Sequence, residues 1–226
     1  MGTYVSSPIA YVMGATFVAL SGLFFSLSVG ASFPEASLSG FMTPAITLLV
    51  VIAPLLTMRL LAEEQKMGTL ELLLTSPVRD EEVVLGKFLG SLFMVLIMFG
   101  ITLYFPIILF IFGDPDIMPI LTGYLGLTLV AATLLSIGVF CSSLTSNQII
   151  AAVVSLGIGF ALLMFGAAAG YMSGLAADVL NYLSIQTQVQ DMTLGIIDTR
   201  HLTYFLSLIS LFLFLTIRNL ESRRWR

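Results

Sequence analysis

Long apolar runs alternate with short polar connections along the chain, and the apolar runs dictate its architecture. Six runs approach or exceed the length of about 20 mostly apolar residues that crosses a bilayer. The expected spans cover Ile9–Val29, Phe41–Leu61, Val83–Phe112, Ile117–Leu144, Ile149–Ala169 and Leu202–Ile217. The pattern therefore predicts an all-α polytopic membrane protein with six transmembrane helices in a single transmembrane domain, residues 1–226.

Two runs and one connection depart from a simple up-and-down arrangement. The third and fourth runs are longer than a bilayer needs, so we expect them to tilt, to project from the membrane, or to kink at Pro106 and Pro119. The connection before the last span, Gly170–His201, is half apolar but too broken to cross. It predicts one or two short helices that lie at the outer face or dip into it.

Basic residues gather on one side of this expected topology. Four of them, Arg59, Lys66, Arg79 and Lys87, lie in or beside the connection after the second span. Four more, Arg218, Arg223, Arg224 and Arg226, lie in the tail after the sixth span. Of the nine Lys and Arg residues only Arg200 falls on the other side. Because cytoplasmic connections are enriched in Lys and Arg, we expect a multi-pass protein of the cell (inner or plasma) membrane with both termini cytoplasmic.

Composition agrees with this placement and excludes several function classes. The chain has 226 residues, of which 58% are hydrophobic and 10% charged, too few for the surface of a soluble domain. No basic stripe suits nucleic acid. No Asp, Glu, Lys, Arg or His lies in the middle of a span, which argues against a proton-coupled transporter and against a membrane enzyme with a His or carboxylate–metal centre. We expect His201 to be a surface residue and Cys141 a small core residue.

The chain also lacks the residues that hydrolyse ATP. The pair Gly86-Lys87 lies in LGKF, without the surrounding GxxxxGK[ST] of a phosphate-binding loop. We expect no cofactor or metal on this chain. If transport needs ATP, a partner must supply the ATPase.

One short charged segment interrupts the apolar pattern after the second span. On a helix, Glu64, Gly68 and Glu71 share one face, and an apolar face lies beside it. The apolar residues are Met67, Leu70, Leu73 and Leu74. Glycine within a helix costs about 1 kcal/mol, so Gly68 predicts either a bend, with Thr69 capping a new turn, or close approach of another backbone.

The boundaries of this segment and its role follow from its residue types. Pro77 ends the element, and Asp80 is the expected N-cap of the third span. The segment is either an interfacial helix with solvated charges or a docking surface. Its polar face is acidic, which anionic headgroups would not favour, and this points to a protein partner.

The sequence of this segment resembles a family motif. EEQKMGTLELLLTSPV, residues 63–78, is similar to the EE-x3-GTLE-x-LL-x-(T/S)-P pattern of ABC-2 type transporter permeases, and it follows the second span as in that family. The stretches SSPIAYVMGATFVALSGLFFS, VLGKFLGS, SSLTSNQIIAA and GIIDTRHLTYFLSLISLFLFLTIRNLESRRW resemble the subgroup named for the gliding-motility-associated permease. Family members usually begin with an amphipathic interfacial helix, and we expect that element to be missing or very short here, where only MGTYVSS precedes the first span.

The resemblance implies an ABC-2 (type V exporter-like) permease fold with a cytoplasmic coupling helix at residues 63–76 and outer re-entrant helices within Gly170–Ile197. The implied contacts to the ATPase are Glu63, Glu64, Gly68, Thr69 and Glu71, with Thr145 and Asn147 in a second cytoplasmic contact, Leu144–Gln148. It also implies a homodimer, or a heterodimer with a related permease, in the lipid bilayer. An ABC ATPase subunit then carries the ATP and Mg²⁺.

The expected function is that of the membrane subunit of an ATP-driven transporter that exports its substrate. Two alternatives stay open. A haem- or copper-related ABC permease shares the architecture and differs in cargo. A passive channel or scaffold needs no ATPase and does not depend on the charged segment.

Overall fold

The computed structural model describes residues 8–29, 38–69, 79–113 and 115–224 of the chain. Within these ranges every regular element is an α-helix. The helices are α2 (Pro8–Val29), α3 (Ser39–Thr57), α4 (Ala62–Met67), α6 (Asp80–Thr102), α7 (Tyr104–Phe112), α8 (Ile117–Leu144), α9 (Gln148–Ala169), α10 (Leu175–Leu183), α11 (Ile185–Thr193) and α12 (Thr199–Arg224).

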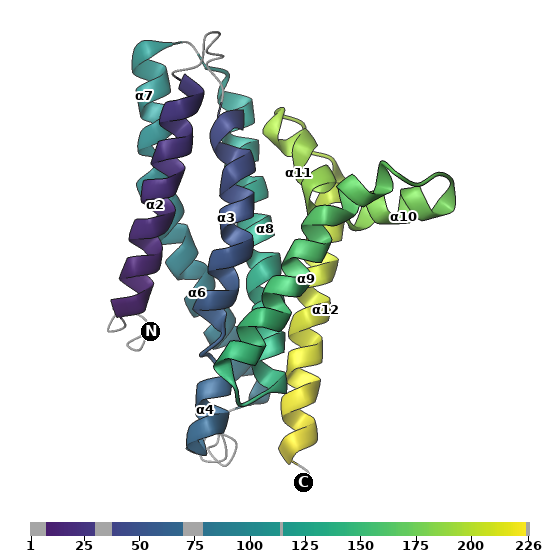
Figure 1. Cartoon of the computed structure of the whole chain (residues 1–226). Coiled ribbons are helices and arrows are strands. Elements are labelled where there is room, and N and C mark those ends of the chain that lie inside the picture. Colours follow the sequence, from purple (N-terminus) through teal and green to yellow (C-terminus); the bar gives the residue numbers. More distant parts are fainter. Residues whose placement is uncertain (1–7, 30–37, 70–78, 114, 225–226) are drawn as a thin grey trace.

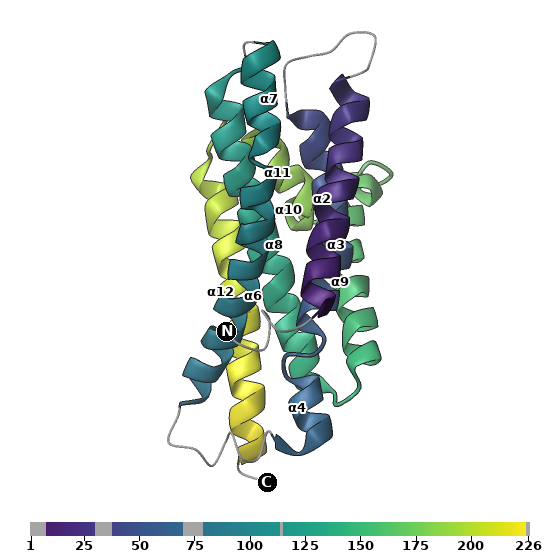
Figure 2. The same ribbon diagram turned by 90° about the vertical axis from the view of Figure 1, so that its left-hand side faces the viewer.

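The long helices run side by side as one bundle, with α4 at one end and α10 and α11 toward the other (Figure 1). We call these the α4 end and the α10 end. Figure 2 shows the same bundle from the side, where α2, α3 and α9 lie on one flank and α6 and α12 on the other. Six helical stretches are long and apolar enough to cross a membrane, which confirms the expected six-span, all-α architecture.

Helix α8 is the centre of this bundle. It packs against α3, α6, α9, α11 and α12. All ten residues from Val130 to Val139 are buried. One of them, Gly138, allows α3 to approach closely, because a Cβ at this position would lie 1.9 Å from Thr57 Oγ1. The end of α3 is therefore packed closely against α8.

The ends of three helices, α3, α6 and α12, differ from the limits expected from the apolar runs. Helix α3 stops at Thr57, although the apolar run continues to Leu61. Helix α12 extends beyond both ends of its apolar run, because polar residues continue a helix once it leaves the hydrocarbon. The expected cap at Asp80 is wrong by one residue: Asp80 is the first residue of α6, and the N–H of the preceding Arg79 donates to Glu82 Oε2 at 3.2 Å.

The connection before the last span forms two short helices, as expected, and they differ in burial. Ile185, Val189 and Met192 of α11 are fully buried against α8 and α9. In contrast, α10 has no buried residue and projects sideways from the bundle at the α10 end (Figure 1). Helix α11 is thus part of the core, whereas α10 rests on the flank of α9.

The third span is broken between α6 and α7, close to one of the two expected kinks. Proline lacks the N–H that would bond the carbonyl four residues back, so Pro106 leaves the Thr102 carbonyl free. Tyr124 on α8 donates its hydroxyl to that carbonyl at 3.0 Å. Pro119 causes no break, because it lies in the first turn of α8, where N–H groups have no helical acceptor.

Removal of the Tyr124 hydroxyl should therefore destabilise the protein. We expect Tyr124→Phe to cost about 1–2 kcal/mol, because the buried Thr102 carbonyl loses its donor. The cost should largely disappear in a Pro106→Ala background, where the N–H of residue 106 can bond that carbonyl. Thermal unfolding in detergent measures both effects. Tyr171→Phe, which alters a 93% exposed side chain, is the control. An equal loss with and without Pro106 would contradict this account.

Candidate partner-docking site

Helix α4 is a single short element between α3 and the segment that precedes α6. It has six residues and ends at Gly68, whose φ of 71° is in the left-handed region that glycine adopts without strain. A Cβ on Gly68 would have no described atom within 4 Å. Gly68 therefore produces a bend, the first of the two expected alternatives, and no backbone among the described residues approaches it closely.

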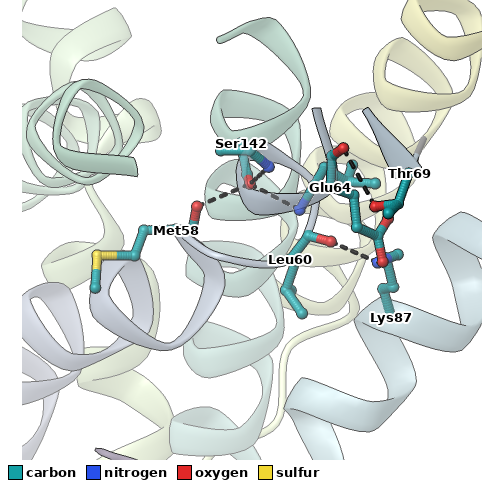
Figure 3. Close-up of polar contacts among 8 residues, drawn as sticks. Met58, Leu60, Glu64, Thr69, Lys87 and Ser142 are labelled. Carbon is teal, nitrogen blue, oxygen red and sulfur yellow. Dashed lines mark hydrogen bonds and ion pairs between the residues drawn. The ribbon is translucent and has the colours of Figure 1, made fainter. Parts of the chain in front are cut away.

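The turn that joins α3 to α4 depends on a serine from α8. The Ser142 hydroxyl accepts the N–H groups of Leu61 and Ala62 at 3.1 and 3.0 Å (Figure 3). The same hydroxyl donates to the Met58 carbonyl at 3.1 Å. Leu61 and Ala62 are fully buried, so water cannot replace these bonds. One side chain thus satisfies three backbone groups that the helix termini leave without partners.

A lysine from α6 closes the other side of this turn. Lys87 Nζ lies 2.5 Å from the Leu60 carbonyl oxygen and 2.5 Å from Glu64 Oε1 (Figure 3). The side chains of Lys87 and Glu64 are only 18% and 32% exposed, so the ion pair is partly shielded from solvent screening. The second carboxylate oxygen of Glu64 is buried without a hydrogen bond in the described part of the chain. Glu64 is thus directed into the bundle.

Two amides add further links between α4, α8 and α12. Gln65 Nε2 donates to the Ser143 carbonyl at 2.9 Å. Asn219 Nδ2 on α12 donates to the same carbonyl at 2.8 Å. We call Ser142, Ser143, Lys87, Glu64 and Gln65 the α4 clamp. Through the clamp, α4 is bonded directly to α6 and α8, and Asn219 ties α12 to the carbonyl that holds Gln65.

The opposite face of α4 is open. Glu63, Lys66 and Met67 are exposed, and Met67 is 71% exposed. Gly68 and Thr69 follow on the same open end, where the Thr69 hydroxyl donates to the Glu64 carbonyl at 3.4 Å. The element therefore has a clamped inner face and a bare outer face that carries one acid, one base and an exposed thioether.

The expected second contact lies at the same end of the bundle as α4. Asn147 caps α9, since its Oδ1 accepts the Ile149 N–H at 3.0 Å, and the Thr145 hydroxyl accepts the Asn147 N–H at 3.1 Å. Both side chains are used locally to shape the loop between α8 and α9. Helix α4 contacts both of these helices, so the loop and α4 form one continuous end surface.

Several expected features of the segment lie outside the described residues. Glu71 and the apolar residues Leu70, Leu73 and Leu74 all belong to residues 70–78, and so does Pro77. Residues 63–69 are thus the described part of the expected coupling element. The expected absence or shortness of a helix before the first span concerns residues 1–7, which also lie outside.

Sequence reasoning missed the residues that hold α4. Lys87 was expected only as one of the basic residues beside the connection, and Ser142, Ser143 and Asn219 had no expected role. A signal was present: two adjacent serines end the fourth apolar run on the same side as the charged segment. Serine hydroxyls near helix ends can form hydrogen bonds with backbone groups that lack a helical partner.

A second polar cluster lies at the α10 end, where His201 is not the surface residue that was expected. Its side chain is 13% exposed. Nδ1 lies 2.5 Å from Gln188 Oε1, and Nε2 lies 2.9 Å from Asp191 Oδ2. Gln188 in turn donates to the Tyr182 carbonyl at 2.7 Å. His201 therefore holds α11 against the start of α12.

A neighbouring carboxyl shapes the beginning of α12. The Arg200 N–H donates to Asp198 Oδ1 at 2.9 Å. This backbone hydrogen bond is the main cause of the lowered pKa of the Asp198 carboxyl, and the nearby charges of Arg200 and His201 act in the same direction. Asp198 thus stays ionised where the positive end of the α12 dipole favours negative charge.

Comparison with known proteins identifies the family. The profile of the family described as "ABC-2 family transporter protein" matches residues 4–220, which is nearly the whole chain. The chain belongs to the ABC-2 transporter family. A search of curated proteins found no significant match. This ABC-2 permease is accordingly a multi-pass membrane transport subunit, and the short helix α4 stands where the family motif occurs in its sequence.

The clamp makes a direct prediction about stability. Ser142→Ala should leave two buried N–H groups and one carbonyl without partners, at a cost of about 2–4 kcal/mol. We expect a lower unfolding temperature in detergent and faster amide hydrogen exchange over residues 58–67.

Ser146→Ala is the matched control, because Ser146 is exposed in the loop before α9. It should change neither quantity. Unaltered exchange over residues 58–67 in the Ser142 variant would show that the clamp does not hold the turn.

Proposed function

We propose that this ABC-2 permease is driven by a separate ABC ATPase subunit, that the ATPase binds at the α4 end, and that the cargo is exported. The observation that carries the proposal is the two-faced character of α4. Its inner face is bonded to α6 and α8 through Glu64, Gln65 and Ser142. Its outer face leaves Glu63 and Met67 exposed. A helix built in this way can receive a force on one face and deliver it through the other.

The clamp supports transmission of motion rather than simple anchoring. When an ATPase dimer closes on ATP, a rigidly held α4 would move together with α3, α6 and α8. Packed helices shift as bodies rather than deform continuously. The Lys87–Glu64 pair links α4 to the start of α6, and Ser142 links it to the end of α8. We infer that rocking of these spans opens the pathway toward the outside.

The ATPase contacts that we propose differ from those implied by the family motif in the role of Glu64. Glu63, Gly68 and Thr69 face outward and would contact the ATPase, together with Lys66 and Met67. Glu64 would act through Lys87. We keep three further contacts on the resemblance to the family. Glu71 follows α4 in the sequence, and Thr145 and Asn147 lie in the loop beside α4.

The charge distribution supports a cytoplasmic α4 end. Arg59 and Lys66 flank or lie on α4, and Arg79 and Lys87 lie at the start of α6. Arg200 lies at the α10 end, at the start of α12. By the positive-inside rule the α4 end faces the cytoplasm, where an ATPase and its ATP and Mg²⁺ would be found. Both termini would then be cytoplasmic.

The working assembly that we propose contains two permease chains, each a single transmembrane domain, and two ATPase subunits. The transport pathway would lie between the two permeases. The second permease is either another copy or a related chain. The resemblance of the first span, of VLGKFLGS, of SSLTSNQIIAA and of the closing segment from Gly195 supports a proposed membership in the gliding-motility-associated subgroup. The permease itself would bind no cofactor.

The docking proposal is tested by changing the outer face of α4 alone. Glu63→Lys with Met67→Asp should reduce co-purification of the cognate ATPase at least tenfold, because it reverses one charge and removes the exposed thioether. Both side chains are exposed, so the unfolding temperature should stay unchanged. Asp178→Lys, on exposed α10, is the control and should leave binding intact. Undiminished ATPase binding by the double variant would instead favour a passive channel or scaffold.

The role of Glu64 is separated from docking by a charge swap. Glu64→Lys should uncouple ATP hydrolysis from the permease because it faces Lys87 with a like charge. Adding Lys87→Glu should restore part of the coupling, since the pair is re-formed with reversed polarity while the Leu60 carbonyl loses its donor. Stimulation of ATP hydrolysis by the permease is the measurement. If the second substitution fails to rescue, Glu64 acts by contacting the ATPase and not through Lys87.

Topology is tested by thiol labelling in a Cys141→Ala background, since Cys141 is the chain's single cysteine. A membrane-impermeant maleimide should label Ser173→Cys in intact cells, because Ser173 is exposed at the α10 end. It should label Met67→Cys only after the membrane is opened. The reverse pattern would place α4 outside the cell.

A further inference from the structure

Both ring nitrogens of His201 lie against oxygen atoms of α11. Nδ1 faces the amide oxygen of Gln188 at 2.5 Å, and Nε2 faces a carboxylate oxygen of Asp191 at 2.9 Å. A neutral imidazole has one N–H donor, whereas an imidazolium has two. Whether both hydrogen bonds can exist at once therefore depends on how many protons the ring holds.

The Tyr182 carbonyl fixes the direction of the Gln188 amide. Gln188 Nε2 donates to this carbonyl at 2.7 Å, and a carbonyl can only accept. The amide oxygen is thereby left facing His201, and it needs a proton on Nδ1. Gln188 is buried, so water cannot readily replace either bond. The opposite nitrogen faces Asp191 and needs a proton as well, so only the doubly protonated ring bonds Gln188 and an ionised Asp191 together.

Histidine is the residue type in this cluster that changes charge near neutral pH. The charged and titratable side chains around the ring are Asp191 from α11, Tyr182 from α10, Asp198 before α12, and Arg200 and Tyr204 from α12. Of these residue types only histidine ordinarily changes charge between about pH 5 and pH 8. Over this range a change in the cluster is thus a change of the His201 ring.

A neutral ring can keep only one of its two contacts. If the remaining proton is on Nδ1, the contact with Asp191 becomes two facing lone pairs. If the proton is on Nε2, the Gln188 oxygen loses its donor, and turning the amide round would break its bond to the Tyr182 carbonyl. In either case α11 loses one of its links to the start of α12.

One link supports the end of α10. No residue of α10 is buried, and the carbonyls of Tyr182 and Leu183 lie in its last turn, where carbonyls have no donor within the helix. Gln188 donates to the first of these carbonyls, and the Tyr204 hydroxyl donates to the second at 2.7 Å. One of the two bonds that hold this end of α10 is thus made by the amide that His201 faces.

The other link supports the turn after α11. The Asp191 carbonyl accepts the N–H groups of Leu194 and Ile196 at 3.1 and 3.0 Å, while the Asp191 carboxylate reaches His201. The Asp191 side chain is 49% exposed, so protons from the surrounding solution can reach the pair. The contact therefore joins this turn to α12 at a place that is open to changes of pH.

We propose that His201, Gln188 and Asp191 form a pH-sensitive latch at the α10 end of the permease. At acidic pH the ring holds two protons, both links are made, and α10 and the turn after α11 are fastened to α12. As the pH rises the ring loses one proton, one link breaks, and these segments loosen while the core of the bundle stays packed. That the latch senses the outer solution rests on the proposed topology, whereas the latch itself does not.

The test uses His201 as its own probe, because it is the chain's only histidine. The full-length permease, labelled with ¹⁵N-histidine and purified without a histidine tag, is placed in phosphatidylcholine nanodiscs without ATPase. NMR should show both ring nitrogens protonated at about pH 5 and only one at about pH 8. Hydrogen exchange, normalised to the intrinsic rate at each pH, should show the protection of residues 175–198 falling at least fivefold over this range.

Asp191→Asn separates the latch from the titration of the ring. An amide at this position can accept from a protonated Nε2 and can donate to a deprotonated one. The ring should still titrate, but the protection of residues 175–198 should no longer depend on pH. His201→Phe should show low protection at both pH values. Asp178→Asn, on exposed α10, is the matched control and should keep the wild-type pH dependence.

Three results would each overturn the proposal. The ring could hold the same number of protons at both pH values. The protection of residues 175–198 could stay constant while the ring titrates. Asp191→Asn could keep the wild-type pH dependence, which would show that the contact between Asp191 and His201 is not the link that responds.

Discussion

The structure depends on how the chain leaves α3 and turns into α4 inside an apolar bundle. A helix that ends there leaves N–H and C=O groups without partners, and in a buried place each such group costs about 1–3 kcal/mol. The Ser142 hydroxyl forms hydrogen bonds with three of these groups, and the Lys87 amine donates to a fourth, the Leu60 carbonyl. The turn is thus possible only because α6 and α8 supply polar atoms at this level of the bundle.

The same bonds make α4 part of the membrane bundle rather than an attached loop. The Thr57–Gly138 contact packs the end of α3 against α8 just above the turn. The Lys87–Glu64 pair then joins the start of α6. For an ABC-2 permease this arrangement offers a short rigid path from an exposed surface to the spans, while His201 holds α11 at the opposite end.

Much of this fold could be predicted from the sequence, because apolar run length sets the number of spans and the broken run Gly170–His201 indicates short helices. The hydrogen bonds between residues far apart in the sequence could not be predicted. The apolar pattern continues through Leu61, so it hides the end of α3, which depends on a serine some eighty positions later. The inward direction of Glu64 was equally hidden, since a carboxylate on an amphipathic segment looks solvent-facing until its partner Lys87 is placed. A bend at Gly68 was one of two alternatives that the glycine indicated, and the sequence alone could not choose between them.

The central claim is that α4 and the adjoining ends of α6 and α8 move as one body. It is tested most directly by linking α4 to α6 with a cleavable bis-maleimide in Glu64→Cys/Lys87→Cys permease, in a Cys141→Ala background, and measuring ATP hydrolysis by the assembled complex. If the ends move together, the cross-link should replace the lost Lys87–Glu64 pair and keep permease-stimulated hydrolysis at the wild-type rate, whereas cleavage should lower the rate toward that of Glu64→Lys. Hydrolysis that stops on linking and returns on cleavage would show that α4 moves relative to the bundle, and would contradict the claim.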